Sequence, residues 1–137
     1  EIDCKDYENF AIDSSKIPNF DYYLQNAPKV LHAFASAQLA KNIFKIDDEE
    51  VLEAISWHTL GHKNMSKLAK IIYLADLLEP SRDVTPLKEI NSLARKNYEQ
   101  AFLLAMAFSL EYLIKQKKFI CKDTIEAWNE MLKIEKK

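Results

Sequence analysis

The sequence predicts an all-α protein, folded as a compact helical bundle. The chain of 137 residues contains one glycine and four prolines, and one glycine cannot serve the many tight turns of a β-sandwich. Apolar residues recur every three or four positions along most of the chain, as they do on the buried face of a helix. Hydrophobic residues make up 48% of the composition, and a single domain of this length can bury a real core without disulfides.

The N-terminal part of the chain is the least regular. Residues 1–27 mix polar residues with one proline and a short aromatic cluster, which indicates one or two short helical turns. We expect the helical core over residues 28–137. Its first helix begins at Pro28, because proline is tolerated in the first turn of a helix. It continues to about Lys45, where the helical spacing of apolar residues ends.

Signals at both ends bound the second helix. Asp47 and Glu50 form a capping box, and the acidic residues between them suit the positive end of the helix dipole. The helix runs to about Trp57, and Gly61, the only glycine of the chain, ends it. Helices commonly end at a residue in the left-handed conformation, which glycine adopts without a steric penalty.

The third helix covers about residues 66–79 and ends ahead of Pro80, since proline has no N–H group to donate. Thr85 and Pro86 form the next start signal, a capping residue followed by a proline in the first turn. We therefore expect Thr85 to be the N-cap of the following helix.

That following helix either continues through Asn97 or bends there, and it runs to about Lys118. Its middle section is apolar around most of its circumference, so we expect it to lie at the centre of the core. Asp123 and Glu126 form a second capping box, which opens the last helix of the chain.

The composition excludes several classes of function. The 19 basic and 21 acidic residues nearly cancel to a net charge of −2, so no nucleic-acid partner is expected. Walker and dinucleotide-binding loops need more than one glycine, so the single glycine of this chain excludes both. The longest uncharged apolar run, residues 101–110, has about half the length of a membrane-spanning helix, and the first residues do not resemble a signal peptide. We expect a cytoplasmic protein with no membrane partner, in which Cys4 and Cys121 are free thiols.

Three ionisable residues stand on helix faces that the periodicity assigns to the core: His32, His58 and Asp76. Each also has a purely structural explanation. His32 can bond a carbonyl, His58 can stabilise a helix C-terminus, and Asp76 can pair with Arg82 or Arg95. Together, two inward histidines and an inward aspartate on three helices form a ligand set for iron, manganese or zinc. A lone buried carboxylate is costly, so we expect Asp76 to meet a cation, a metal or several hydrogen-bond donors.

His62 follows His58 by four residues, the spacing that places two zinc ligands on one face of a helix. Gly61 lies between them, so the pair straddles a helix end and we expect His62 to be exposed. Arg82 stands in a loop after the third helix, where it is either solvated or able to bind a phosphate. No serine or cysteine stands in the setting of an activated nucleophile.

Three segments of the chain carry a combined pattern: PKVLHAFASAQLAKNIFKI, EEVLEAISWHTLGHKNMSKLAKIIYLADLLEPSR and FICKDTIEAWN. In order and spacing, over about residues 26–129, they resemble the YqeK-type branch of the HD-domain metal-dependent phosphohydrolases. The resemblance implies a helical enzyme that hydrolyses dinucleoside tetraphosphates symmetrically, converting diadenosine tetraphosphate to two ADP. It implies a divalent metal, with iron first and manganese or another transition metal as the alternative.

Carried over by position, the resemblance implies that His32, His58 and Asp76 hold the metal and that Asp76 and Arg82 take part in catalysis. Metal-activated water would attack a phosphorus while the metal and Arg82 hold the developing charge. The ligand would be a dinucleotide or an ADP-like molecule, and a homodimer stays open. The nucleotide-binding residues that the resemblance implies are Lys29, His58, Thr59, Arg82, Phe119, Ile120, Cys121, Lys122, Asp123 and Thr124.

The sequence departs from the family at the feature that gives the family its name. An adjacent His-Asp pair is expected upstream of these segments, and no His-Asp dipeptide occurs in the chain. We therefore expect one helical HD-like domain over residues 1–137 that is truncated at its N-terminus and has little or no activity by itself. Two alternatives stay open: an HD-type phosphohydrolase of another nucleotide specificity, and a non-catalytic helical nucleotide-binding or interaction module.

Overall fold

A computed structural model describes residues 11–82 and 84–136 of the protein. These residues form seven α-helices and two short 3-10 helices and contain no strand, which confirms the all-α prediction. In chain order the elements are η2 (Ser14–Lys16), α1 (Phe20–Asn26), η3 (Pro28–Val30), α2 (Leu31–Asn42), α3 (Glu49–Trp57), α4 (Lys67–Leu77), α5 (Thr85–Ala94), α6 (Tyr98–Lys115) and α7 (Lys122–Glu135). None of the helices in the described part of the chain has the combination of length and apolar content that crossing a membrane requires.

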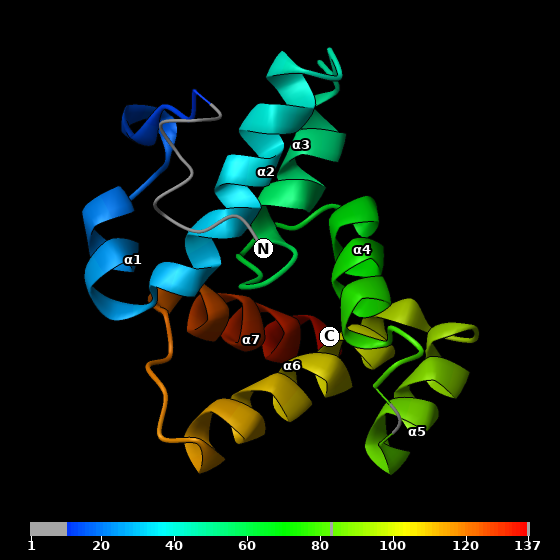
Figure 1. The fold of residues 1–137 in the computed structure, drawn as a ribbon. Coiled ribbons are helices and arrows are strands. Elements are labelled where there is room, and N and C mark those ends of the chain that lie inside the picture. The colour runs from blue at the N-terminus through cyan, green and yellow to red at the C-terminus, as the bar shows by residue number, and fades with distance from the viewer. Residues whose placement is uncertain (1–10, 83, 137) are drawn as a thin grey trace.

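The helices pack largely in chain order. Helices α2 and α3 form an antiparallel pair, α3 packs on α4, and α6 packs on α4, α5 and α7 (Figure 1). The long connection after α6 returns the chain to α1, so the first turn of α7 lies beside α1 (Figure 1). Segments from the beginning, the middle and the end of the chain therefore meet around the start of α2.

Several helix ends agree with the sequence signals, but the capping residue of α3 does not. Asp48, and not Asp47, caps this helix, because its backbone is extended while its carboxylate accepts from the N–H groups of Glu50 and Val51. The predicted cap is wrong by one residue. The structural reason is that the last non-helical residue supplies the cap, and the helix begins one position later than the capping box indicates.

The helix expected after Thr85 is divided into two. Thr85 is the first residue of α5 and not its N-cap, which is Val84 and makes no side-chain capping bond. The bend expected near Asn97 is a complete break, because the side chain of Asn97 accepts from the N–H of Gln100 and caps α6.

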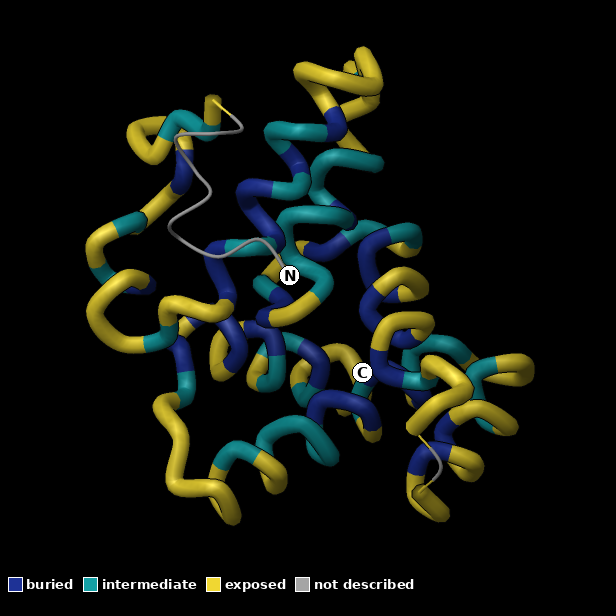
Figure 2. Tube along the Cα trace, viewed as in Figure 1, coloured by how far each residue is buried: buried dark blue, intermediate teal, exposed yellow. Residues whose placement is uncertain are grey.

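Buried hydrophobic residues form two clusters, and Figure 2 shows which parts of the chain are buried. The larger cluster joins α3, α4, α5, α6 and α7, and α6 contributes one face to it, with its opposite face exposed at Leu104 and Tyr112. The expectation of a centrally placed α6 therefore holds for one face only. The smaller cluster, called the α1–α2 cluster below, consists of Ile17, Tyr23, Val30, Leu31, Phe34, Ala35, Leu60 and Cys121.

Gly61 ends the turn after α3 in the left-handed conformation, with φ +68, as the sequence predicts. A Cβ atom at this position would lie 3.7 Å from Ala127 Cβ, Met106 Cε and Met65 Sδ. These are ordinary van der Waals distances, so the backbone conformation and not crowding is what requires glycine here.

Gly61→Ala is therefore expected to lower the free energy of unfolding by about 1 kcal/mol, the cost of placing an L side chain in the left-handed region. Urea unfolding followed by circular dichroism measures the change. Lys117 is the matched control, because it has φ +53 on the exposed surface after α6, and Lys117→Gly is expected to raise the same free energy. An unchanged unfolding free energy for Gly61→Ala would contradict the explanation.

Candidate metal and nucleotide site

His32, in the first turn of α2, and His58, at the end of α3, face each other. Their Nε2 atoms are 3.3 Å apart. The Nδ1 atom of His32 lies 2.5 Å from the carbonyl oxygen of Lys29, and that of His58 lies 2.6 Å from the carbonyl oxygen of Ile55. A carbonyl oxygen can only accept, so each Nδ1 carries a hydrogen and donates it. Each neutral ring therefore presents an Nε2 lone pair to the other ring.

Two lone pairs at this distance repel unless a positive centre lies between them. A shared proton or a metal ion can fill that role. Imidazole nitrogens bind first-row metals such as zinc at about 2.0–2.1 Å, so two nitrogens on one metal lie roughly 3 Å apart. Metal-bound histidines also commonly donate their second N–H to a carbonyl, which fixes the ring orientation. The separation and the tautomers of this pair, called the histidine pair below, thus fit two ligands of one metal.

The packing of α2 against α3 sets the distance between the two rings. Phe34, two residues after His32, contacts the ring of Trp57, one residue before His58, at a centroid distance of 5.0 Å. The hydroxyl oxygen of Thr59 lies 3.4 Å from Nε2 of His32, where it can donate to the lone pair. Both histidines are half-buried, which agrees with the inward positions that the sequence predicts.

Asp76 does not take the position that the sequence predicts. It is exposed on α4, together with Ile71, Ile72 and Ala75, and so the expectation of a buried carboxylate is wrong. No described helix covers this face of α4. No ion pair to Arg82 forms among the described residues, nor does one form to any other cation. Within residues 11–82 and 84–136, no three histidine, cysteine or acidic side chains are arranged to hold a metal.

Arg82 lies exposed in the turn that follows α4. Its backbone N–H donates to the carbonyl oxygen of Glu79 at 2.9 Å, and the Glu79 carboxylate accepts from Ser81. The hydrogen bonds from Ser81 and, to a smaller extent, the charge of Arg82 hold the pKa of the Glu79 carboxyl below its ordinary value. Arg82 therefore lies in the turn just beyond the helix that carries Asp76.

The first turn of α7 lies against the turn that follows His58, because Thr124 donates its hydroxyl to the carbonyl oxygen of Leu60 at 2.8 Å. Asp123 is buried and accepts from the hydroxyl of Tyr23 at 2.6 Å. The expected capping box at Asp123 is wrong, since Cys121 is the N-cap of α7 and makes no side-chain capping bond. The carboxylate is engaged by Tyr23 in the interior.

Apart from His58 and Arg82, which are described above, the residues that the resemblance assigns to the nucleotide divide into two groups. Cys121, Asp123 and Thr124 are buried and hold the loop in place. The exposed members are Lys29, Thr59, Phe119 and Lys122, with Ile120 half-buried. Only the second group offers side chains to a ligand at this surface.

Tyr22 and Tyr23 of α1 are the residues that sequence reasoning missed. Tyr22 accepts from the backbone N–H of Lys122, and Tyr23 donates to Asp123, each across 100 positions of the chain. Burial, followed by the bond to Asp123, raises the pKa of the Tyr23 hydroxyl far above its ordinary value. The only signal in the sequence is an adjacent tyrosine pair ahead of Pro28, and that signal does not identify the partners.

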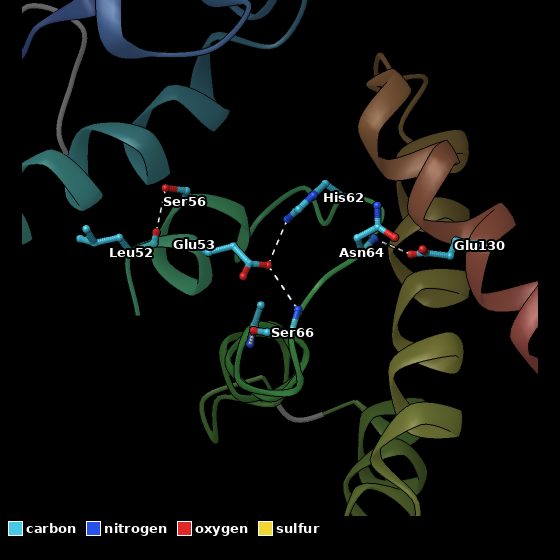
Figure 3. A network of polar contacts seen from close by, with 8 residues as sticks. Leu52, Glu53, Ser56, His62, Asn64, Ser66 and Glu130 are labelled. Carbon is cyan, nitrogen blue, oxygen red and sulfur yellow. Dashed lines mark hydrogen bonds and ion pairs between the residues drawn. The ribbon is translucent and has the colours of Figure 1, made fainter. Parts of the chain in front are cut away.

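The loop between α3 and α4 is attached at both sides (Figure 3). Glu53 of α3 accepts from Nε2 of His62 at 3.2 Å and from the backbone N–H of Ser66 at 3.3 Å. The backbone N–H of Asn64 donates to Glu130 of α7. His62 is half-buried, and so the expectation of an exposed ring is wrong. As the sequence predicts, His62 lies beyond the end of α3, and its Nε2 faces Glu53 and not the histidine pair.

Comparison with known proteins shows which family the part of the chain with the histidine pair resembles. The model of the HD domain matches residues 13–81, which extend from η2 to the end of α4 and include His32, His58 and Asp76. The chain belongs to the HD-domain family. The match ends before Arg82 and leaves the loop of residues 119–124 outside the HD domain proper.

Among relatives of known name, the symmetrical bis(5'-nucleosyl)-tetraphosphatases of Halalkalibacterium halodurans and Bacillus subtilis are 35% and 32% identical over 76% and 79% of this chain. They are matched over 56% and 58% of their own lengths, so this HD-domain chain spans little more than half of them. A solved structure, a predicted HD superfamily hydrolase involved in NAD metabolism from Clostridium acetobutylicum, superimposes with a TM-score of 0.72 at 39% identity. The matched region covers 75% of this chain and 55% of the Clostridium acetobutylicum chain.

Cys121 is a buried free thiol, whereas Cys4 lies outside the described residues. Burial, with a smaller contribution from the Asp123 charge, raises the pKa of Cys121 from 9.0 to about 11. Between these values the unfolded chain loses the thiol proton while the folded chain keeps it. The free energy of unfolding therefore falls as the pH rises through this range.

Cys121→Ala is expected to remove part of this alkaline loss of stability. Urea unfolding of the unsubstituted chain and of Cys121→Ala measures the effect at about pH 8.5 and about pH 10.5, because most of the change in unfolding free energy falls between these two values. Tyr23 contributes a loss of its own above its ordinary pKa and leaves a residual slope in the variant. An identical loss in the two proteins would contradict the assigned role of the thiol.

Proposed function

We propose that this chain provides the histidine pair and part of the nucleotide site of a symmetrical dinucleoside tetraphosphate hydrolase. The observation that carries the proposal is the pair of Nε2 lone pairs facing each other at 3.3 Å, with both Nδ1–H groups donated to carbonyls. The names of the tetraphosphatase relatives give the proposed substrate class, a dinucleotide such as diadenosine tetraphosphate.

In this proposal His32 and His58 are metal ligands. The resemblance adds Asp76 as a further ligand and catalytic residue, although the described residues alone do not assemble a three-ligand set. A bound divalent metal, iron first and manganese as the alternative, supplies a Lewis acid for the phosphate groups. The chain's own exposed groups orient the substrate. Lys29, whose carbonyl oxygen bonds His32, has an exposed side chain, and the hydroxyl of Thr59 lies 3.4 Å from Nε2 of His32. In this proposal both side chains bind phosphate oxygens, and Arg82 holds the charge that develops on the phosphate.

The loop before and in the first turn of α7 supplies the nucleoside contacts. Phe119 and Ile120 offer apolar surface, and Lys122 offers a positive charge. Cys121, Asp123 and Thr124 support this loop from below, because their side chains are buried. Such a surface suits a nucleotide, which has a flat apolar base at one end and phosphates at the other.

His32→Ala and His58→Ala are each expected to lower the affinity for Mn²⁺ by about tenfold or more, because each removes one of two facing ligands. Competition against a chromophoric chelator measures the affinity. His62→Ala is the matched control, since this ring bonds Glu53 and not the histidine pair, and it is expected to leave the affinity unchanged. Equal Mn²⁺ affinity in all three variants would remove the basis of the proposed site.

The isolated chain is expected to release ADP from diadenosine tetraphosphate only marginally faster than metal alone, because no three-ligand set is assembled among the described residues. The assay uses added Fe²⁺ or Mn²⁺ and separates the nucleotides by chromatography, with mononucleotides as parallel substrates. Robust turnover would contradict this expectation, and faster release of phosphate from mononucleotides would favour another specificity.

The exposure of Asp76 favours one alternative, a non-catalytic nucleotide-binding or interaction module. In such a module the histidine pair would share a proton and would bind no metal. The metal affinity of the histidine variants separates the two functions. Cytoplasmic localisation and a homodimer stay predictions.

A further inference from the structure

Two tyrosines of α1 hold the first turn of α7. Tyr22 accepts from the backbone N–H of Lys122 at 3.1 Å, and Tyr23 donates to the carboxylate of Asp123 at 2.6 Å. The first N–H groups of a helix have no partner within the helix, and the N-cap residue Cys121 makes no side-chain bond to them. Tyr22 thus supplies from another helix the acceptor that α7 lacks locally.

The two tyrosines differ in exposure. Tyr23 is completely buried, and its ring stacks on Phe34 at 5.4 Å in the α1–α2 cluster. Tyr22 is half-buried, and its hydroxyl oxygen accepts from the backbone N–H of Lys122, which leaves the hydroxyl hydrogen available to a further acceptor. Tyr23 therefore fastens the helix, whereas Tyr22 reaches the surface where the loop meets solvent.

The Tyr22 ring also orders the exposed side chains of the loop. The ammonium of Lys122 lies 5.1 Å from the ring centroid, within the range of a cation–π interaction. The Phe119 ring meets the Tyr22 ring edge to face at 5.9 Å. One side chain of α1 thereby contacts the two groups, one aromatic and one cationic, that the loop presents outward.

We propose that Tyr22 is a positioning residue for nucleotide binding, and that it sets Phe119 and Lys122 in the arrangement that takes a nucleoside diphosphate. Its hydroxyl places the backbone of Lys122, and its ring places the ammonium and the Phe119 ring. The inference rests on the proposed function, since it assigns the ligand class of the same surface. Tyr22 can be replaced without loss of the fold, because Tyr23 to Asp123 and Thr124 to Leu60 still attach α7.

The test is calorimetric titration of the chain with ADP in the presence of Mn²⁺. Tyr22→Phe keeps the ring and removes the acceptor, so ADP affinity is expected to fall about two- to tenfold. Tyr22→Leu removes the ring as well, so the ADP affinity is expected to fall further, by about tenfold or more. Tyr112→Leu is the matched control, because it also removes an aromatic ring with a lysine ammonium over it, that of Lys118 at 5.8 Å from the ring centroid, but contacts neither Lys122 nor Phe119 in any described interaction. This variant should not change ADP affinity.

A second measurement distinguishes positioning from general structural damage. The Mn²⁺ affinity and the melting temperature of Tyr22→Phe are expected to match those of the unsubstituted chain. Wild-type ADP affinity in both Tyr22 variants would overturn the inference, and so would a parallel loss of ADP affinity, Mn²⁺ affinity and melting temperature. If His32→Ala loses Mn²⁺ while the Tyr22 variants bind ADP normally, the proposed function stands and this inference alone fails. If the unsubstituted chain does not bind ADP, both the nucleotide part of the function and this inference fail.

Discussion

The imidazole rings of His32 and His58 have both given their only N–H group to a backbone carbonyl, and their remaining nitrogens face each other across 3.3 Å. This arrangement is unfavourable without a positive centre, so the surrounding structure has to impose it. Two features hold the rings in place. The 3-10 turn η3 places the Lys29 carbonyl beside His32, and the contact between Phe34 and Trp57 holds α2 against α3.

The α1–α2 cluster explains why the candidate nucleotide residues lie around that pair. It includes Tyr23 of α1, Leu60 after α3 and Cys121 before α7, so burial of one apolar cluster brings together three segments that are far apart in sequence. The hydrogen bonds from Tyr23 to Asp123 and from Thr124 to Leu60 fix their register. The larger cluster is formed by residues of α3 to α7. Asp76 lies on the exposed face of α4, outside this cluster.

Local signals in the sequence identified the helices and several of their ends. Apolar spacing located α2, α3, α4 and α7, but it joined α5 and α6 into one helix with at most a bend at Asn97. Gly61 could be recognised as a helix end because glycine adopts the left-handed conformation without a steric penalty. The cap at Asp47 was placed one residue too early and the cap at Thr85 one residue too late, because capping depends on where the backbone enters the helical region. The resemblance to a known family, and not periodicity, supplied the roles assigned to the candidate site residues.

The features that sequence could not supply all depend on tertiary partners. Periodicity marks the face of α4 around Asp76 as apolar, but it does not tell which element covers that face, and no described helix does. Asp123 has the local pattern of a capping residue, whereas its partner Tyr23 is 100 positions away. The tautomers of the histidine pair likewise follow from carbonyls that only the folded backbone places.

The state of the two imidazoles is directly observable by ¹⁵N NMR of the histidine side chains, with and without added Zn²⁺ as a diamagnetic probe. We expect both His32 and His58 to be protonated at Nδ1 and bare at Nε2 in the metal-free neutral state, and Zn²⁺ to shift both Nε2 resonances together while His62 stays unchanged. A hydrogen on Nε2 of either ring in that neutral state, or a Zn²⁺ response confined to one of the two, would contradict a metal site built on this pair.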